Sequence, residues 1–318
     1  MRKKLLVGIL LIAMSITILA GCSSKDKVFK IGVNQFVTHA ALDASYQGFV
    51  DALADAGYVD GENIKIDFQN AQGDQSTANT IATKLINDEN DLILAIATPS
   101  AQAVANATKD IPILVTAVTD PAASGLVASN EAPGGNVSGT SDLTPVKRQF
   151  ELLKQLVPDA KNVAVLYCSS ESNSKIQADM AIAAAEENGL TAIEATVSNS
   201  NEIQQVVQSL VDKVDVIYAP TDNIIAAGMP TVALVANENG IPVICGEEGM
   251  VDKGGLATYG IDYYKLGRLT GEQAVKIIKG EATTDKLPIG YLPDEEYALS
   301  INEEVAAQIG IEIPAELK

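Results

Sequence analysis

The sequence predicts an α/β protein of two Rossmann-like lobes, each built on a parallel sheet and joined to the other by a hinge. Three observations predict this class. The chain of 318 residues is too long for one ordinary hydrophobic core. Strand-like and helix-like segments alternate along it. Their order occurs twice, in units far longer than a solenoid repeat, which indicates two lobes.

The two halves align segment by segment. Each half reads as strand, helix, strand, helix, strand, helix, strand, and helices end at Gly57, Gly189 and Gly240. In the first half the predicted strands are 29–33, 63–68, 91–96 and 111–115, and the predicted helices are 44–56, 76–87 and one that follows residue 97. In the second half the strands are 161–167, 191–196, 215–219 and 241–245, and the helices are 175–188, 201–211 and one that follows residue 219.

One stretch, residues 91–104, reads as a buried strand that runs directly into a helix. Residues 92–97 are continuously apolar, as in a strand covered on both faces. Thr98 and Ser100 are good N-cap residues, and Pro99 suits a first helical turn. Their hydroxyls and the unpaired N–H groups of the helix start could hold an anionic group such as a carboxylate. The alternative is that Thr98 or Ser100 caps its own helix.

The glycine-rich segment 133–142 has the pattern of a hinge, with a surface loop as the alternative, and a helix over 145–156 starts the second lobe. Residues 257–262 form a second crossing, and the helix 263–280 returns to the first lobe. A further strand at 297–301 and a helix at 303–310 follow. We therefore assign residues 28–142 and about 262–282 to the first lobe, and residues 143–261 and about 283–318 to the second.

The N-terminus has the pattern of a signal peptide over residues 1–21. A basic start precedes an apolar core, 5–19, that is shorter than the roughly 20 residues of a spanning helix. The residues that lead to Cys22 resemble the lipobox of bacterial lipoproteins. That resemblance implies cleavage before Cys22 and lipid, such as palmitate, on its sulfur, with residues 22–27 as a tether. The alternative is an ordinary signal peptide with an incidental cysteine.

Charge and composition exclude several functions. The formal net charge is −19 and becomes more negative if the basic N-terminus is removed, so nucleic acid and anionic lipid are poor partners, and we expect membrane contact through the lipid anchor only. His39 is the only histidine, which excludes a Ser-His-Asp triad and a poly-histidine metal site. No glycine run resembles a P-loop. We expect no cofactor and no metal, and we expect Cys168 and Cys245 to be buried free thiols, with a disulfide as the alternative.

Candidate ligand-binding residues lie where predicted strands end. In open parallel sheets, ligands bind outside the carboxyl ends of the strands. One lobe offers hydroxyl groups at a helix start, and the other offers carboxylates and an amide, which suits a zwitterion. We expect its carboxylate at Thr98 and Ser100, its ammonium at some of Asp142, Asp222 and Glu247, and its side chain near Phe36 or Tyr218. The full set of candidates is Asn34, Gln35, Phe36, Thr98, Ser100, Thr119, Asp120, Asp142, Asp222, Asn223 and Glu247.

Each candidate has a purely structural alternative. Asp222 and Asn223 could cap the helix that follows them. Asp142 could cap the helix that starts near Pro145. Residues 119–121 could form a plain turn, and Phe36 could belong to the core. The functional interpretation therefore depends on the recurrence of candidates at the same place in both halves.

Several stretches resemble the substrate-binding proteins of one family of bacterial ABC importers. They are Ile31-Gly-Val-Asn-Gln-Phe36, Ala97-Thr-Pro-Ser-Ala-Gln102, Thr119-Asp-Pro121, Pro133-Gly-Gly-Asn-Val-Ser-Gly-Thr-Ser-Asp142 and Gly254-Gly-Leu-Ala-Thr-Tyr-Gly-Ile-Asp-Tyr-Tyr-Lys-Leu-Gly267. The resemblance implies the type I periplasmic-binding fold with three crossings, an extracytoplasmic location, and a separate permease and ATPase as partners. Within this family, the sequence is similar to the group linked to tryptophan and other aromatic amino acids. Ala40 follows His39 where the family motif has proline.

The sequence thus predicts a monomeric, lipid-anchored binding protein that captures a small zwitterion, such as tryptophan, by closure of its lobes and delivers it to a permease. Two alternatives stay open. One is a binding protein for a sugar or nucleoside, against which the absence of tryptophan counts, because sugar sites use aromatic platforms. The other is a surface lobe that senses its ligand for a signalling receptor. An enzyme has little support.

Overall fold

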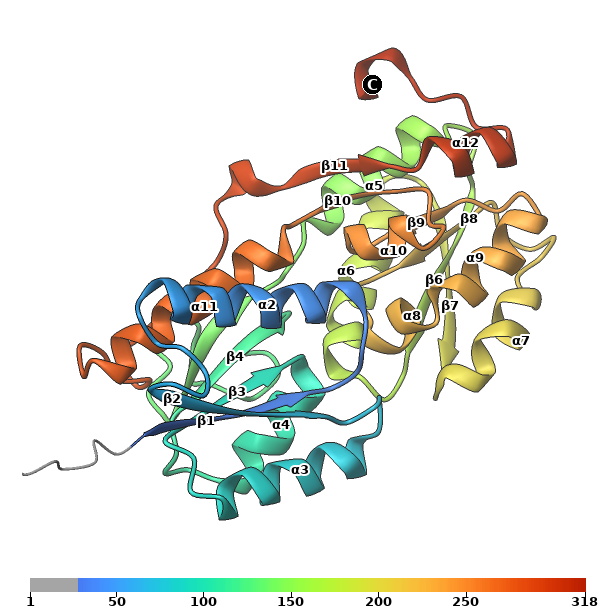
Figure 1. The fold of residues 1–318 in the computed structure, drawn as a ribbon. Helices are drawn as coiled ribbons and strands as arrows, with labels where there is room; N and C mark the ends of the chain where they lie inside the picture. The colour runs from blue at the N-terminus through green and yellow to red at the C-terminus, as the bar shows by residue number, and fades with distance from the viewer. Residues whose placement is uncertain (1–27) are drawn as a thin grey trace, which may run out of the picture.

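The computed structural model describes residues 28–318 and shows two α/β lobes (Figure 1). The predicted signal peptide, residues 1–21, and Cys22 with its tether to residue 27 lie outside the described residues. Within residues 28–318, no helix has both the length and the apolar character needed to cross a membrane.

The first lobe is built on a five-stranded sheet in the order β2-β1-β3-β4-β5, and all of its pairs are parallel. β3 and β4 are buried along their whole length, as their continuous apolar sequences predict. The strands are β1 Phe29–Gln35, β2 Ile64–Asn70, β3 Leu92–Ile96, β4 Ile113–Val118 and β5 Val137–Ser141. The helices of this lobe are α2 Ala40–Asp55, α3 Gln75–Asn87, α4 Thr98–Ala107 and α11 Tyr263–Ile278.

The second lobe has a six-stranded sheet in the order β11-β10-β9-β8-β6-β7, in which only the edge strand β11 runs antiparallel to its neighbour. The strands are β6 Asn162–Cys168, β7 Thr191–Val197, β8 Val216–Ala219, β9 Val243–Cys245, β10 Ala257–Gly260 and β11 Ala298–Ile301. The helices are α5 Val146–Leu156, α6 Ser172–Glu187, α7 Ile203–Gln208, α8 Asn223–Ala227, α9 Met229–Glu238, α10 Glu248–Asp252 and α12 Glu303–Ile309. This topology confirms the predicted fold class.

Some predicted elements differ in detail. The helix expected over 201–211 is a short 3-10 turn followed by α7, and the helix after β8 is broken at Gly228 into α8 and α9. The segment expected to be only a hinge contains β5, which is fully buried and pairs with β4. Backbone pairing to a neighbouring strand therefore turns this glycine-containing segment into part of the first sheet.

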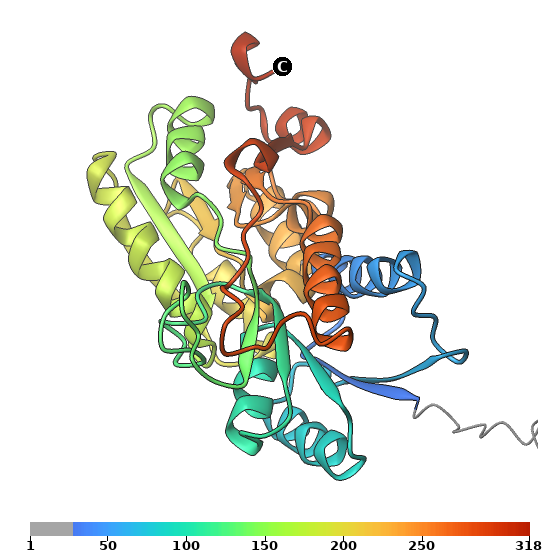
Figure 2. The ribbon, with the colours of Figure 1, turned by 90° about the vertical axis from the view of Figure 1, so that its left-hand side faces the viewer.

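The chain crosses between the lobes three times: after β5, after β10 and before β11 (Figures 1 and 2). The third crossing comes later than expected. The sequence predicts the return to the second lobe near residue 283, but Gly290 donates its N–H to the Gly139 carbonyl at 2.8 Å and its own carbonyl accepts the N–H of Ser141 at 2.9 Å. Residues up to 290 therefore stay beside β5, and the chain crosses over residues 291–297.

Helix α11 is held on the first lobe by backbone contact with α2. A Cβ atom on Gly48 would lie 2.0 Å from the Tyr264 carbonyl oxygen, and one on Gly267 would lie 1.9 Å from the Ser45 carbonyl oxygen. Only glycine permits this separation, because any side chain would push the helices apart. The pair of glycines thus fixes where α11 begins, and Tyr263 at its first position reaches the crossings.

Two further observations concern chemistry that the fold does not use. Cys168 and Cys245 are buried and form no disulfide, which confirms the expectation of free thiols. Among the described residues, no group of three or more His, Cys, Asp or Glu side chains is placed to hold a metal ion.

Candidate functional site

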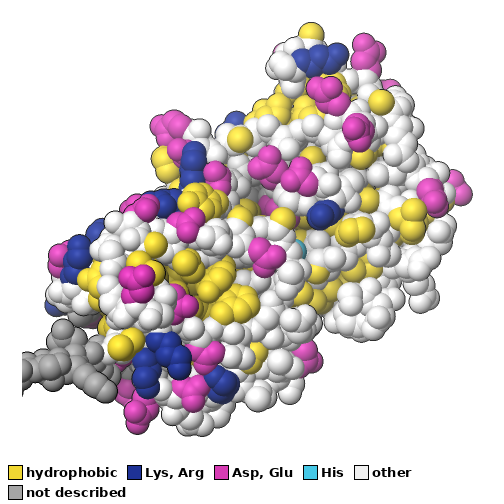
Figure 3. Space-filling model, viewed as in Figure 1, with side chains coloured by type: hydrophobic (Ala, Val, Ile, Leu, Met, Phe, Trp, Pro, Cys, Tyr) yellow, Lys and Arg dark blue, Asp and Glu magenta, His cyan; other side chains and the backbone are white. Residues whose placement is uncertain are grey.

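The two lobes are in contact across the space between them. His39 Nε2 lies 3.4 Å from Asn223 Oδ1, and the hydroxyl of Thr119 lies 3.5 Å from that of Thr221. Gln102 of α4 donates to the Ser172 hydroxyl of α6 at 3.1 Å. In Figure 3 the colour of histidine, of which the chain has one, shows as a small patch in the seam between the lobes. The structure therefore represents a closed arrangement.

A narrow cavity, with room for about one water molecule, lies in this seam. The first lobe contributes His39, Leu42 and Ala117, and the crossings contribute Asp142 and Tyr263. The second lobe contributes Thr221, Asp222, Asn223, Ala226 and Glu247. Four of the predicted site residues, Asp142, Asp222, Asn223 and Glu247, thus meet around one cavity. None of the residues that line it is Lys or Arg.

Asp142 contributes to this cavity a buried carboxylate oxygen that no described residue bonds. It follows β5 at the first crossing and is 4% exposed. The Tyr263 hydroxyl donates to its Oδ2 at 2.7 Å, whereas its buried Oδ1 has no hydrogen-bond partner among the described residues. Burial raises the pKa of Asp142 to about 6. It does not cap the helix that follows, because the N-cap position of α5 is Pro145. A cationic donor would satisfy this oxygen.

Glu247 and Asp222 are already bonded to the backbone. Glu247 Oε2 accepts the N–H of Gly249 at 2.6 Å and caps α10, and burial raises the pKa of Glu247 to about 7, with the charge of Asp142 adding to the rise. Asp222 caps α8 through Ile225 at 2.8 Å and accepts the N–H of Cys168 at 2.6 Å. The structure thus shows the capping role that was the alternative for Asp222.

Glu171 is a buried acid that sequence reasoning missed. It lies behind the cavity at the N-cap position of α6, and it accepts the N–H of Ile224 at 3.1 Å and the side-chain amide of Asn223. Burial, together with the charge of Asp222, raises the pKa of Glu171 to about 8. Glu171 is therefore a positioning residue that orients Asn223 toward His39.

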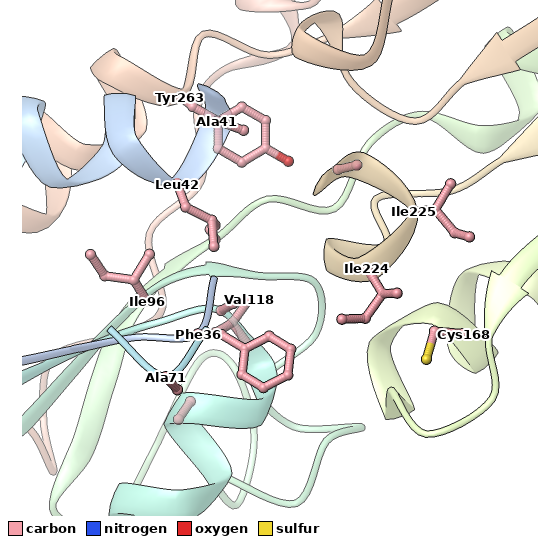
Figure 4. Close-up of a cluster of buried hydrophobic side chains, with 14 of the residues drawn as sticks. Phe36, Ala41, Leu42, Ala71, Ile96, Val118, Cys168, Ile224, Ile225 and Tyr263 are labelled. Atoms are coloured by element: carbon pink, nitrogen blue, oxygen red, sulfur yellow. The ribbon is translucent and has the colours of Figure 1, made fainter. Parts of the chain in front are cut away.

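The seam has an apolar side as well as an acidic one. Figure 4 shows Phe36 and Leu42 of the first lobe and Ile224 of the second pointing toward one another, with the Tyr263 hydroxyl directed into the space between the lobes. Phe36 is 4% exposed and belongs to the hydrophobic cluster that both lobes share. An apolar wall beside a carboxylate group can receive a ligand with an ammonium group and a hydrophobic side chain.

Thr98 differs from Ser100, its neighbour in the first turn of α4. The expectation that one of them caps this helix is wrong, because the N-cap residue is Ala97, which makes no side-chain cap hydrogen bond. The Ser100 hydroxyl is bonded to Asn34 Oδ1 at 3.1 Å. The Thr98 hydroxyl is buried and has no partner among residues 28–318. Only Thr98 therefore keeps a free hydroxyl at this helix start.

The remaining first-lobe candidates make structural hydrogen bonds, and like Phe36, Thr98 and Ser100 they do not line the cavity. Asn34 donates to the Ala78 carbonyl at 3.0 Å, and Gln35 donates to Asp43 at 2.7 Å. Asp120 accepts the N–H groups of Ala122 and Ala123 and the amide of Asn130, which makes it a turn residue. Thr119 instead lies at the contact between the lobes, near Gln177 and Thr221.

Two alanines beside the seam have backbone conformations that favour glycine. Ala97, at the end of β3, has φ of 78°, and Ala117, at the end of β4, has φ of 54°. Ala117 lines the cavity. Strained backbone of this kind costs free energy and is retained where surrounding structure enforces it, commonly at ligand sites. The strain therefore marks the same edge of the first sheet as the predicted strand ends.

Comparison with known proteins shows the family to which this chain belongs. A family model for ABC transporter substrate binding proteins matches residues 30–318. The chain is 49% identical over 316 residues to the tyrosine-binding protein of Clostridioides difficile, which covers 95% of this chain and 91% of that protein.

Two solved structures are informative about the lobe arrangement. One is the ABC domain from Streptococcus pneumoniae in complex with L-Trp, 43% identical, with a TM-score of 0.87 over 91% of this chain and 97% of that one. The other is the ligand-free, open structure of a Clostridium difficile substrate-binding protein with adhesive properties. It is 51% identical, with a TM-score of 0.68 over 91% and 97%. The ligand-free, open structure has the higher sequence identity but the lower TM-score. This is expected if the lobes of the present structure are closed.

Proposed function

The chain belongs to the family of ABC transporter substrate-binding proteins, and from that premise we propose that it captures an aromatic amino acid between its lobes for delivery to a permease. Members of this family bind solutes outside the cytoplasm. Two relatives support the ligand class, since one is a tyrosine-binding protein and another was solved with L-Trp.

One observation carries the ligand proposal: the buried Oδ1 of Asp142 has no partner among residues 28–318, in an acidic cavity whose lining contains no Lys or Arg. Burying carboxylates without cations is costly, and a ligand ammonium compensates that cost. We assign the ammonium to Asp142, with Glu247 as its neighbour. The ligand carboxylate goes to the first turn of α4, where the buried Thr98 hydroxyl has no partner among the described residues. Phe36, Leu42 and Ile224 border the aromatic side chain.

The mechanism we propose is closure of two bodies around the ligand. The first comprises residues 28–142 and about 262–290, and the second comprises residues 143–261 and about 291–318. Thr119, Thr221 and Asn223 meet partners across the seam only when these bodies approach. The ligand stabilises closure in proportion to its differential affinity for the closed state.

We further propose that the chain is a monomer held to the membrane by lipid on Cys22 after removal of residues 1–21. Cys22→Ser should then release the protein from the membrane fraction, and mass spectrometry of the wild type should find acyl chains on the first residue of the mature protein.

A thermal-shift screen tests the ligand class. Residues 23–318, refolded to remove carried-over ligand, are melted with each amino acid, common sugars and nucleosides. A ligand that binds only the folded state raises Tm by mass action. A shift with aromatic amino acids alone supports the proposal. A shift with a sugar or nucleoside alone would retain the family and overturn the assignment of ammonium and carboxylate sites.

A further inference from the structure

His39 has a hydrogen-bonding nitrogen that the protein leaves unused. The residue precedes α2 and lines the cavity together with Leu42 and Asp142. Its Nε2 lies 3.4 Å from Asn223 Oδ1, across the seam. Its Nδ1 is buried and has no partner among residues 28–318.

The surrounding donors fix which His39 nitrogen carries the proton. Glu171 Oε2 is approached by three N–H donors: the Asn223 side-chain amide, the Asn223 main chain and the Asn173 side chain, the last two at 3.4 Å. This oxygen therefore accepts whether or not Glu171 holds a proton on its other oxygen. The Asn223 amide thus points its nitrogen at Glu171 and its Oδ1, an acceptor only, at His39.

It follows that His39 Nε2 donates to Asn223. Burial lowers the pKa of His39 to about 4, so the ring is neutral at ordinary pH and carries one proton. With that proton on Nε2, Nδ1 is an acceptor. A buried acceptor without a donor is unfavourable, and the described residues supply none. A ligand that presents an N–H or O–H group can supply one.

We infer that His39 Nδ1 accepts a hydrogen bond from the side chain of the bound amino acid, so that the site selects tryptophan or tyrosine over phenylalanine. This inference rests on the proposed function. The ligand ammonium, with its three N–H donors, is assigned to Asp142 and the neighbouring Glu247, and we assign the indole N–H or the phenol O–H to His39. A site built to bond a side-chain donor rejects an analogue without it, because the buried polar group is then left unpaired.

Isothermal titration calorimetry on refolded residues 23–318 tests the inference without any mutation. We expect the better of tryptophan and tyrosine to bind at least tenfold more tightly than phenylalanine. If tryptophan is the ligand, 3-benzothienylalanine, in which sulfur replaces the indole N–H at nearly constant shape, should also lose at least tenfold. Equal affinity for phenylalanine, or for the benzothienyl analogue, would overturn the inference while amino-acid binding stands.

A matched pair of variants separates the two nitrogens. The Gln side-chain nitrogen can replace Nε2, so His39→Gln keeps the donor to Asn223 and removes the Nδ1 acceptor. The Asn side-chain oxygen can replace Nδ1, so His39→Asn does the reverse. The preference over phenylalanine should collapse in His39→Gln and persist in His39→Asn, with thermal melting as a check on folding.

Other results point elsewhere. An equal loss of affinity for all three amino acids in His39→Gln would contradict the inference, since it would assign His39 to lobe closure or to the ammonium group. If no amino acid binds the wild type, the proposed function fails and the inference fails with it. The two failures are therefore distinguishable.

Discussion

Asp142 and Tyr263 connect two of the three crossings through a single hydrogen bond: the Tyr263 hydroxyl donates to Asp142 Oδ2 at 2.7 Å. The other oxygen of the carboxyl group is buried and unpaired among residues 28–318. One oxygen is thus held by the protein, which orients the other toward the cavity. Because Asp142 lies on a crossing, a ligand bound to it touches the part of the chain about which the lobes move.

Replacing Asp142 by Asn should weaken binding of an aromatic amino acid by about 2 kcal/mol or more, because the ammonium loses its buried charged partner. The measurement is titration calorimetry on the refolded protein. Asp179→Asn serves as the control, since this exposed acid pairs with Lys175 on the surface of α6, away from the cavity lining. Similar affinity in both variants would remove Asp142 from the ammonium site.

Ligand binding should depend on pH in the acidic range. Burial raises the pKa of Asp142 to about 6 and that of Glu247 to about 7. An ammonium group binds the ionised carboxylates, so protonated Asp142 and Glu247 must lose their protons when the ligand binds. Affinity should therefore fall as pH decreases from about 7 to 5, by up to about tenfold per unit for each proton released. Calorimetry in two buffers of different ionisation enthalpy measures the protons directly.

The folding stability of the ligand-free protein should change with pH in the opposite direction to the ligand affinity, because of the same two groups. Their folded-state pKa values lie above the ordinary values of 3.8 and 4.5, so the folded state binds more protons in this window. Their contribution to stability then increases as pH falls through about 7 to 5. The ligand-induced rise in Tm should shrink over the same range, and to a lesser extent in a variant with Asp142→Asn and Glu247→Gln. A ligand-induced rise in Tm that stays the same across this pH range would contradict the prediction.

Thr98 and Ser100 should respond differently to removal of their hydroxyls. Thr98→Val should reduce affinity by about 1 kcal/mol with little change in stability, since no described group bonds this hydroxyl. Ser100→Ala leaves Asn34 Oδ1 without its donor, so it should lower the free energy of unfolding by about 1–3 kcal/mol. Urea unfolding and calorimetry on both variants make the comparison. The reverse pattern would move the ligand carboxylate away from Thr98.

Gly267→Ala should lower the free energy of unfolding by about 3 kcal/mol, because the new Cβ would overlap the Ser45 carbonyl and force α2 and α11 apart. Alanine is otherwise the better helix former, so propensity alone predicts a gain. Gly135→Ala is the control, since its Cβ meets nothing within 4 Å. Urea titration that shows equal stability in the two variants would contradict the close helix contact.

Apolar periodicity predicted the sheets well because burial on both faces leaves a strong pattern, as in β3 and β4. It missed β5, whose sequence Val137–Ser141 is small and polar and becomes a strand only through pairing with β4. The antiparallel strand β11 was predicted as a strand, but its partner β10 lies about forty residues earlier, and a local pattern carries no information on that distance.

The site was harder to predict because capping and ligand binding use the same residue types. Asp222 and Asp142 both follow strand ends, yet one bonds two backbone N–H groups and the other keeps a free oxygen. Tyr263 lies within a stretch that resembles the family and His39 lies close to another, but neither residue has a periodic signal. Glu171 follows the end of β6, two residues beyond Ser169. Its role depends on a contact with α8, which lies about fifty residues later in the sequence.

The absence of Lys and Arg from the cavity lining affects how readily the lobes close without a ligand. An empty protein that closes must bring several carboxyl groups out of water with no counter-ion, so it opens again or takes up protons. The amino acid brings the counter-ion with it. On the proposed mechanism, closure is therefore coupled to the ligand by charge balance, so the closed form is favoured when the ammonium group is bound.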